Sequence, residues 1–235
     1  MGLERLAAVL QHENNNYDTD GFKSLVKAVV DLTPKANGVK TDNASVRVIA
    51  DHIRSTAFMI VDGVIPSNEG RGYVLRRIIR RAIRHGHKIG IDKVFFYRLA
   101  PVLALELKDV YPELKKALAS VEKVLKREEQ RFAQTLDQGM SILEDAITNL
   151  KGSEIDGETV FKLYDTFGFP VDLTADVARE RDLTIDMPGF EVEMTKQRDR
   201  ARQAGDFKTT QKGVDISDAT EFLGYEQLEN SSSIQ

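Results

Sequence analysis

The stretch GRGYVLRRIIRRAIRHGHK, residues 70–88, decides how this chain folds. From Arg71 to Lys88 it contains six Arg and one Lys, and no acidic residue. Its apolar residues share one half of a helical wheel: Val74, Leu75, Ile78, Ile79, Ala82 and Ile83. Most of its basic residues share the other half: Arg76, Arg77, Arg80, Arg81, Arg84 and Lys88. This pattern predicts an amphipathic helix that buries one face in a core and presents a row of cations on the other.

The basic face of this helix predicts an anionic partner. Like charges one helical turn apart repel each other, and an anion that pairs with guanidinium groups in fork geometry would relieve the repulsion. A nucleic-acid backbone fits this description, so we expect phosphate contacts from six arginines: Arg71, Arg76, Arg77, Arg80, Arg81 and Arg84. The alternative is that these arginines are structural and pair with Glu69, Asp92 or acids of the long helix described below.

The composition limits the classes of protein to which this chain can belong. Its 235 residues are enough for one large domain or two small ones, and 41% of them are hydrophobic, which allows a real core. The net charge of -4 excludes a generally basic nucleic-acid binder and favours a localised docking face. The chain has no Cys, which excludes disulfides, and we expect a cytoplasmic protein. No apolar run reaches the roughly 18 residues of a membrane span, so we expect no membrane partner.

Apolar periodicity and capping residues predict a nearly all-helical chain. The expected helices cover about residues 3–10, 18–33, 42–62, 71–86, 94–107, 112–150, 157–167, 172–181 and 188–205. Asp18 or Asp20 is expected to cap the second helix, Asp42 or Asn43 the third, and Asp156 the seventh. Gly86 and Gly90 are expected to end the arginine-rich helix. We therefore predict an all-α fold, a helical bundle.

One predicted helix is much longer than the others. Pro112 suits its first position, and its apolar residues keep a 4-3 spacing: Leu114, Leu118, Val121, Leu125, Phe132, Leu136, Leu143 and Leu150. Glu128, Gly139 and Ala146 interrupt this seam. We favour the spine of a bundle within one chain over a coiled coil between two chains.

The sequence pattern changes after Gly205. Residues 208–213 are polar and loop-like, and residues 214–228 read as short strands. We therefore place a domain boundary near residue 206 and expect a short partial β element at the C-terminus.

Four motifs together resemble the alanyl-tRNA synthetases, a family of class II synthetases. They occur in the family's order: GLERLAAVLQ at residues 2–11, RVIADHIR at 47–54, PSN at 66–68 followed by GRGYVLRRI at 70–78, and LYDTFGFPVDLT at 163–174. The first is similar to the end of class II motif 3. The resemblance implies that residues 1–16 end an aminoacylation domain, that residues 17–205 form a helical tRNA-recognition domain, and that residues 206–235 lead into an editing region.

The resemblance implies a function in translation. We expect this chain to be an internal piece of an alanine–tRNA ligase, an enzyme that attaches alanine to its tRNA and uses ATP and magnesium. Its partners would be the acceptor stem of alanine tRNA and the catalytic and editing domains of the same protein. Motifs 1 and 2 are not in the sequence, so we expect no tight ATP binding and no adenylate formation by the piece alone. The alternative is a free-standing helical RNA- or DNA-binding module.

Individual residues inherit roles from this resemblance. Arg5, with Gly2 beside it, would contact the terminal phosphate of ATP. Asn68 and Asp165 would read the G·U wobble pair of the alanine acceptor stem, because Asn offers a donor and an acceptor whereas Asp accepts only. The six arginines would contact tRNA phosphates. Outside the family, Asn68 reads as a loop or capping residue and Asp165 as a surface residue.

The histidine-containing pairs are weak metal candidates. Asp51 and His52 are adjacent, but a surface or orienting role is the better interpretation than metal binding. His85 and His87 lie at the end of the arginine-rich helix, where cations suit the helix dipole. We therefore predict no metal site.

Overall fold

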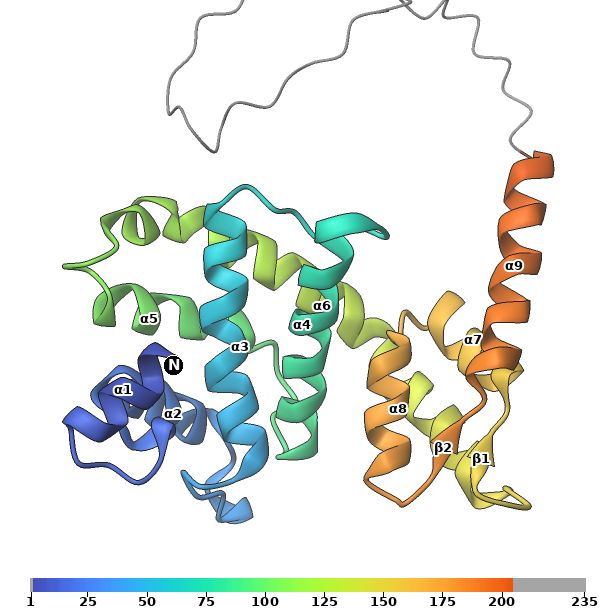
Figure 1. Cartoon of the computed structure of the whole chain (residues 1–235), viewed down its shortest axis with the longest axis horizontal. Coiled ribbons are helices and arrows are strands. Elements are labelled where there is room, and N and C mark those ends of the chain that lie inside the picture. Colours follow the sequence, from blue (N-terminus) through green and yellow to red (C-terminus); the bar gives the residue numbers. More distant parts are fainter. Residues whose placement is uncertain (1, 205–235) are drawn as a thin grey trace, which may run out of the picture. The chain divides into compact units, whose positions relative to one another are not determined.

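The computed structural model describes residues 2–204, and the side chains of residues 2–200. Within this range nine α-helices follow one another: α1 Leu3–Leu10, α2 Asp20–Leu32, α3 Ala44–Val61, α4 Gly70–Lys88, α5 Ala100–Glu106, α6 Pro112–Thr148, α7 Gly157–Asp165, α8 Val171–Arg179 and α9 Met187–Ala204 (Figure 1). Three 3-10 turns join them: η1 Asn16–Asp18, η2 Lys35–Asn37 and η3 Phe96–Leu99. The prediction of an all-α bundle is confirmed.

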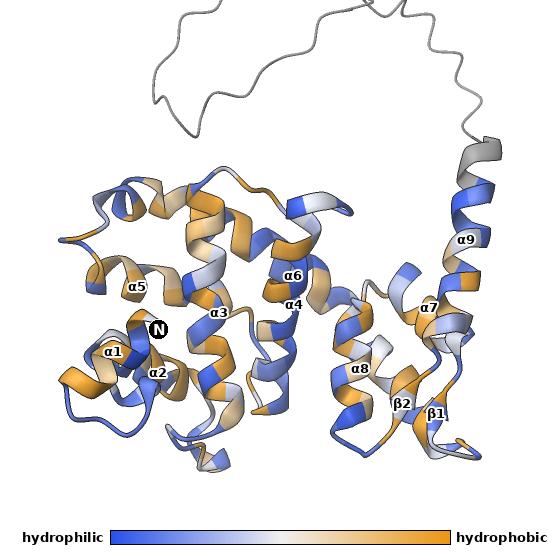
Figure 2. Cartoon of the chain, viewed as in Figure 1, coloured by the Kyte–Doolittle hydropathy of each residue, from blue (hydrophilic) through white to orange (hydrophobic). Residues whose placement is uncertain are grey.

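The core forms around α3. This helix packs against α2 and α5 and also against α4 (Figure 1). Leu and Ile side chains from these helices are fully buried between them, among them Leu25, Ile49, Ile53, Leu75 and Ile79. Each such side chain contributes about 1.5–3 kcal/mol when it leaves water. Figure 2 shows the resulting alternation of apolar and polar positions along α3 and α4, although Val74, expected on the apolar face, is 45% exposed.

The long helix α6 is the spine of the bundle. It contacts α3, α4, α5 and η3, which precede it in the sequence, and α7, which follows it. Most of its predicted seam is buried within the chain: Leu114, Val121, Leu125, Phe132, Leu136 and Leu143. The spine interpretation is confirmed, because this seam is already occupied by neighbouring helices of the same chain.

Two predicted helix starts are confirmed, because a capping side chain is present at each. Asn43 accepts a hydrogen bond from Ser45 N at 2.8 Å and Asp156 accepts one from Thr159 N at 2.8 Å, so both cap their helices. The prediction for α2 was wrong, since Thr19 occupies the N-cap position ahead of Asp20.

Gly86 does not end α4, which continues to Lys88. A Cβ on Gly86 would lie 2.3 Å from the ring of Phe95, so this glycine allows a close contact inside the helix. Gly90, with φ of 87°, follows the end of the helix as expected.

A small parallel sheet was not predicted. β1, Glu154–Ile155, pairs with β2, Thr184–Ile185, in the register Glu154↔Thr184 and Ile155↔Ile185. Two-residue strands leave no periodic pattern in a sequence, which explains the omission. The β element predicted for residues 206–235, and the boundary near 206, lie outside the described residues. No helix among the residues described is long and apolar enough to cross a membrane.

Candidate nucleic-acid interface

The arginines of α4 face acidic residues from other helices. Arg77 Nε lies 2.9 Å from Asp172 Oδ1, and Arg81 pairs with Asp176. Arg84 donates from both Nη atoms to the two carboxylate oxygens of Glu180, each at 2.6 Å. These three acids come from α8 or from the residue that follows it. The helix predicted to present an open basic face therefore packs that face against α8.

This packing changes the expected character of the basic face. Arg80 and Arg84 are buried, with 7% and 5% of their surface exposed. One acid of the long helix does pair with these arginines, since Glu128 contacts Arg76 and Arg80. Glu69 and Asp92, the other expected partners, form no ion pair within the described residues. Arg71 is exposed and also lacks an ion pair there. Phosphate binding by the six arginines stays a prediction. The buried Arg80 and Arg84 form hydrogen bonds to acids from other parts of the chain and so contribute to packing.

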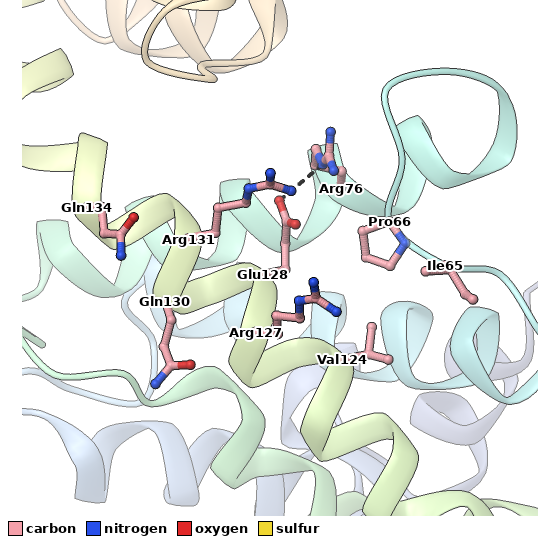
Figure 3. Close-up of a pocket in the computed structure, with 9 residues that line it drawn as sticks. All are labelled: Ile65, Pro66, Arg76, Val124, Arg127, Glu128, Gln130, Arg131 and Gln134. Atoms are coloured by element: carbon pink, nitrogen blue, oxygen red, sulfur yellow. Dashed lines mark ion pairs between the residues drawn. The ribbon is translucent and has the colours of Figure 1, made fainter.

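Glu128 of α6 is the centre of a second set of contacts. Glu128 is 5% exposed, and its carboxylate accepts hydrogen bonds from Nε and Nη2 of Arg80, at 2.8 and 2.6 Å. Arg76 Nε is 3.1 Å from the same carboxylate (Figure 3), but its N–H does not point at the oxygen, so this buried donor has no hydrogen bond. Burial lowers the pKa of Arg80, and Glu128 opposes that effect. One carboxylate thus serves two guanidinium groups.

These contacts reach both residues that were predicted to read the wobble pair. Asn68 is exposed in the loop before α4, and its Oδ1 accepts a hydrogen bond from Arg76. Arg80 donates to the backbone carbonyl of Gly168, three residues after Asp165. Asp165 itself is exposed at the last position of α7. A chain of contacts through Glu128 therefore connects the loop of Asn68 with the turn after Asp165. Its pairs are Asn68–Arg76, Arg76–Glu128, Glu128–Arg80 and Arg80–Gly168.

The segment after Asp165 is held tightly against α6. Gly168 has φ of 70°, and a Cβ there would lie 2.2 Å from Arg80 Nη1, so only glycine allows this approach. Thr135 of α6 donates to the carbonyl of Phe167 at 2.8 Å. The ring of Phe169 packs edge-on against Phe132, with centroids 5.6 Å apart. The backbone that carries Asp165 is consequently fixed from the spine side.

The residues predicted to bind ATP lie at the other end of the described chain. Gly2 is the N-cap of α1, and Arg5 is exposed with no ion pair among the residues described. Glu4 of the same helix accepts a hydrogen bond from Arg54 of α3 at 3.1 Å. The apolar residues Leu3 and Leu10 are 71% and 79% exposed. The contacts described above do not include Gly2 or Arg5.

His52, His85 and His87 each contact a polar side chain. His52 Nδ1 lies 3.1 Å from Asp51, and His87 lies 3.1 Å from Asp137. His85 contacts Ser45 Oγ at 3.0 Å, and burial lowers its pKa to about 4. His85 is therefore neutral at pH 7, and the prediction that it is a cation at the helix end was wrong. No group of three potential metal ligands occurs in the part of the chain that the structure describes.

The sequence of this chain matches a known family. The family model described as tRNA synthetases class II (A) matches residues 1–235. The chain is 84% identical to the alanine–tRNA ligase of Ruthia magnifica subsp. Calyptogena magnifica, 80% to that of Vesicomyosocius okutanii subsp. Calyptogena okutanii and 60% to that of Hydrogenovibrio crunogenus. Each match covers 100% of this chain and 27% of the relative's length. The chain therefore belongs to the class II tRNA synthetases.

Proposed function

We propose that this chain is the part of an alanine–tRNA ligase that recognises the acceptor stem of alanine tRNA. The relatives that match over the whole chain carry that name, and the chain spans about 27% of their length. In the whole protein, ATP and alanine would give alanyl-adenylate with release of pyrophosphate, and the tRNA would then accept the alanyl group with release of AMP. A cytoplasmic location is part of this proposal. None of the relatives named above supports the alternative of a free-standing binding module.

The contacts through Glu128 carry this proposal. They join the loop of Asn68 to the turn that follows Asp165, and the side chains of Asn68 and Asp165 are both exposed. A wobble pair displaces both bases and presents their polar groups in new positions. An amide that can donate and accept, together with a carboxylate that only accepts, can test those positions if their backbones are fixed relative to one another. RNA stems are read most easily near their ends and in the shallow groove.

ATP would use only a small portion of this chain. Arg5 is exposed and carries a charge that no described acid neutralises, so it fits a contact with a phosphate group. When bound, ATP supplies the phosphoanhydride that is broken as alanine is activated. Magnesium would enter with ATP, because this ion is held mainly by substrate phosphates, water and one or two carboxylates.

Two variants test the proposed roles of Asn68 and Asp165. Asn68→Ala and Asp165→Ala should weaken binding of an acceptor minihelix with a G·U pair by about 1–3 kcal/mol, and should weaken a G·C minihelix less. The dependence of affinity on salt should stay as it is, because no phosphate contact is lost. Binding is measured by fluorescence anisotropy with both minihelices.

Matched controls are available in other loops. Asn14→Ala and Asp109→Ala remove an exposed amide and an exposed carboxylate, and should leave both affinities unchanged. Equal losses on the G·U and G·C minihelices for the Asn68 and Asp165 variants would contradict the assignment. These residues would then be a loop residue that holds Arg76 and a surface residue at a helix end.

A further inference from the structure

The exposed side of α6 carries cations that the sequence analysis did not consider. Polar and basic residues follow one another three or four positions apart along one strip of the helix, and all are exposed: Lys116, Ser120, Lys123, Arg127, Arg131, Gln134 and Gln138. Residues at this spacing share a helix face, and this strip contains no acid. Lys116, Lys123, Arg127 and Arg131 are called the α6 basic strip below.

The α6 basic strip differs from the arginines of α4 in its charge balance. Arg77, Arg81 and Arg84 each form an ion pair with a carboxylate from α8 or the residue after it. None of the four cations of the strip forms an ion pair with a residue that the structure describes. Lys123, Arg127 and Arg131 stand four positions apart, where like charges repel by about 0.2–0.5 kcal/mol per pair. The strip is therefore an anion-attracting surface without an internal partner.

The strip also borders the loop that carries Asn68. Arg127 and Arg131 line a pocket of about 510 Å³ together with Ile65 and Pro66 of that loop, and with Glu128 and Arg76 (Figure 3). Figure 3 shows the two exposed arginines projecting from α6 on either side of Glu128. That single carboxylate already serves Arg76 and Arg80, so positive charge exceeds negative charge at the pocket.

The extent of the strip indicates what kind of anion it would bind. Lys116 and Arg131 are 15 residues apart in sequence, about 22 Å along a helix that rises about 1.5 Å per residue. A small anion covers only one or two of these cations. A duplex presents several phosphates over such a length, with one negative charge per about 1.7 Å of its axis. A row of cations that ends beside a base-reading loop is the arrangement expected for a backbone contact.

We propose that the α6 basic strip, with Arg76, binds the phosphodiester backbone of the RNA whose acceptor stem Asn68 and Asp165 read. This inference rests on the proposed function for the identity of the RNA. The main phosphate contacts are thereby assigned to exposed side chains of α6, and not to the arginines of α4 that α8 covers. The base-reading loop and the backbone-binding strip are then neighbours across one pocket.

The test compares two variants with equal changes in charge. Arg127→Gln/Arg131→Gln removes two cations of the strip, and Lys93→Gln/Arg98→Gln removes two exposed cations that form no ion pair within the described residues. All four side chains are exposed, so both proteins should keep the circular dichroism of the wild type. Affinity for the G·U and G·C acceptor minihelices is measured from about 50 to 200 mM salt.

The strip variant should bind both minihelices more weakly by the same factor. The slope of log affinity against log salt should become shallower by roughly 1.4–1.8, the sum for two lost phosphate contacts, whereas the control should keep the wild-type slope. A strip variant with wild-type slope and affinity would overturn the inference. If wild-type protein bound both minihelices equally but the strip variant lost slope, the strip would be supported and the proposed base reading would fail. A chain that binds neither minihelix would overturn both.

Discussion

The buried carboxyl group of Glu129 makes the stability of this chain depend on pH. Glu129 lies on α6 with 1% of its surface exposed, and its carboxylate accepts hydrogen bonds from Phe95 N at 2.8 Å and Phe96 N at 3.0 Å. It thereby holds the N-cap and the first residue of η3 against the spine. Burial raises the pKa of Glu129 to about 7, although these backbone donors act in the opposite direction. The carboxyl group therefore takes up a proton near neutral pH in the folded protein.

The sign of the effect follows from the difference between the folded and unfolded pKa. Because the pKa of Glu129 is raised from 4.5 to about 7, its contribution is fully present below pH 4.5 and is lost as the pH rises to about 7. At about 1.4 kcal/mol per unit of pKa, the free energy of unfolding should fall by about 3 kcal/mol over this range. Glu129→Gln keeps the shape and one acceptor but cannot titrate.

The measurement is urea unfolding of the wild type and Glu129→Gln at several pH values from 5 to 8. His85 acts in the opposite direction, because its pKa is lowered to about 4 and stability is lost as the pH falls from 6.5. Taking the difference between the two proteins at each pH removes this contribution. The wild type should lose stability relative to the variant by about 3 kcal/mol from low to high pH. A difference that stays constant with pH would refute the reasoning.

Three further predictions concern single glycines, Glu180 and the activation of alanine. Gly86→Ala should destabilise the fold by about 1–3 kcal/mol, because its Cβ would lie 2.3 Å from the Phe95 ring. Gly21→Ala is the control and should be neutral or stabilising, because no atom lies within 4 Å of its Cβ. Thermal unfolding measures both variants. Hydrogen bonds from Arg84 lower the pKa of Glu180 to about 2, so this carboxylate stabilises the protein above pH 4.5. The free energy of unfolding of the wild type should therefore lose this contribution as the pH falls from 4.5 to 2, whereas Glu180→Gln should show no such loss. The purified chain should show no alanine-dependent exchange of pyrophosphate into ATP, since one exposed arginine cannot position both reactants; measurable exchange would contradict this.

The order and type of the helices could be predicted because their signals are local. The period of the apolar residues fixed α3, α4 and the spine α6, and the capping side chains of Asn43 and Asp156 fixed two helix starts. The first turn of α2 was misassigned because several residues near Thr19 are equally good capping types.

The surroundings of the candidate site could not be predicted, because they depend on contacts between distant residues. The partners of Arg81 and Arg84 lie 95 and 96 residues further along the chain. Burial of His85, which decides its charge, is set by the packing of helices and leaves no trace in the local sequence. The α6 basic strip did have a local signal, the spacing of Lys123, Arg127 and Arg131, which the concentration of arginines on α4 overshadowed.

If Asn68 and Asp165 read the wobble pair as proposed, this chain distinguishes the G·U acceptor stem of alanine tRNA from a G·C stem. The most direct measurement is the Kd of the unaltered chain for two minihelices that differ only in that base pair, at one fixed salt concentration. The G·U minihelix should bind more tightly by about 1–3 kcal/mol, which is on the order of 5- to 150-fold in Kd. Equal Kd values for the two minihelices would contradict the claim, whatever their absolute affinity.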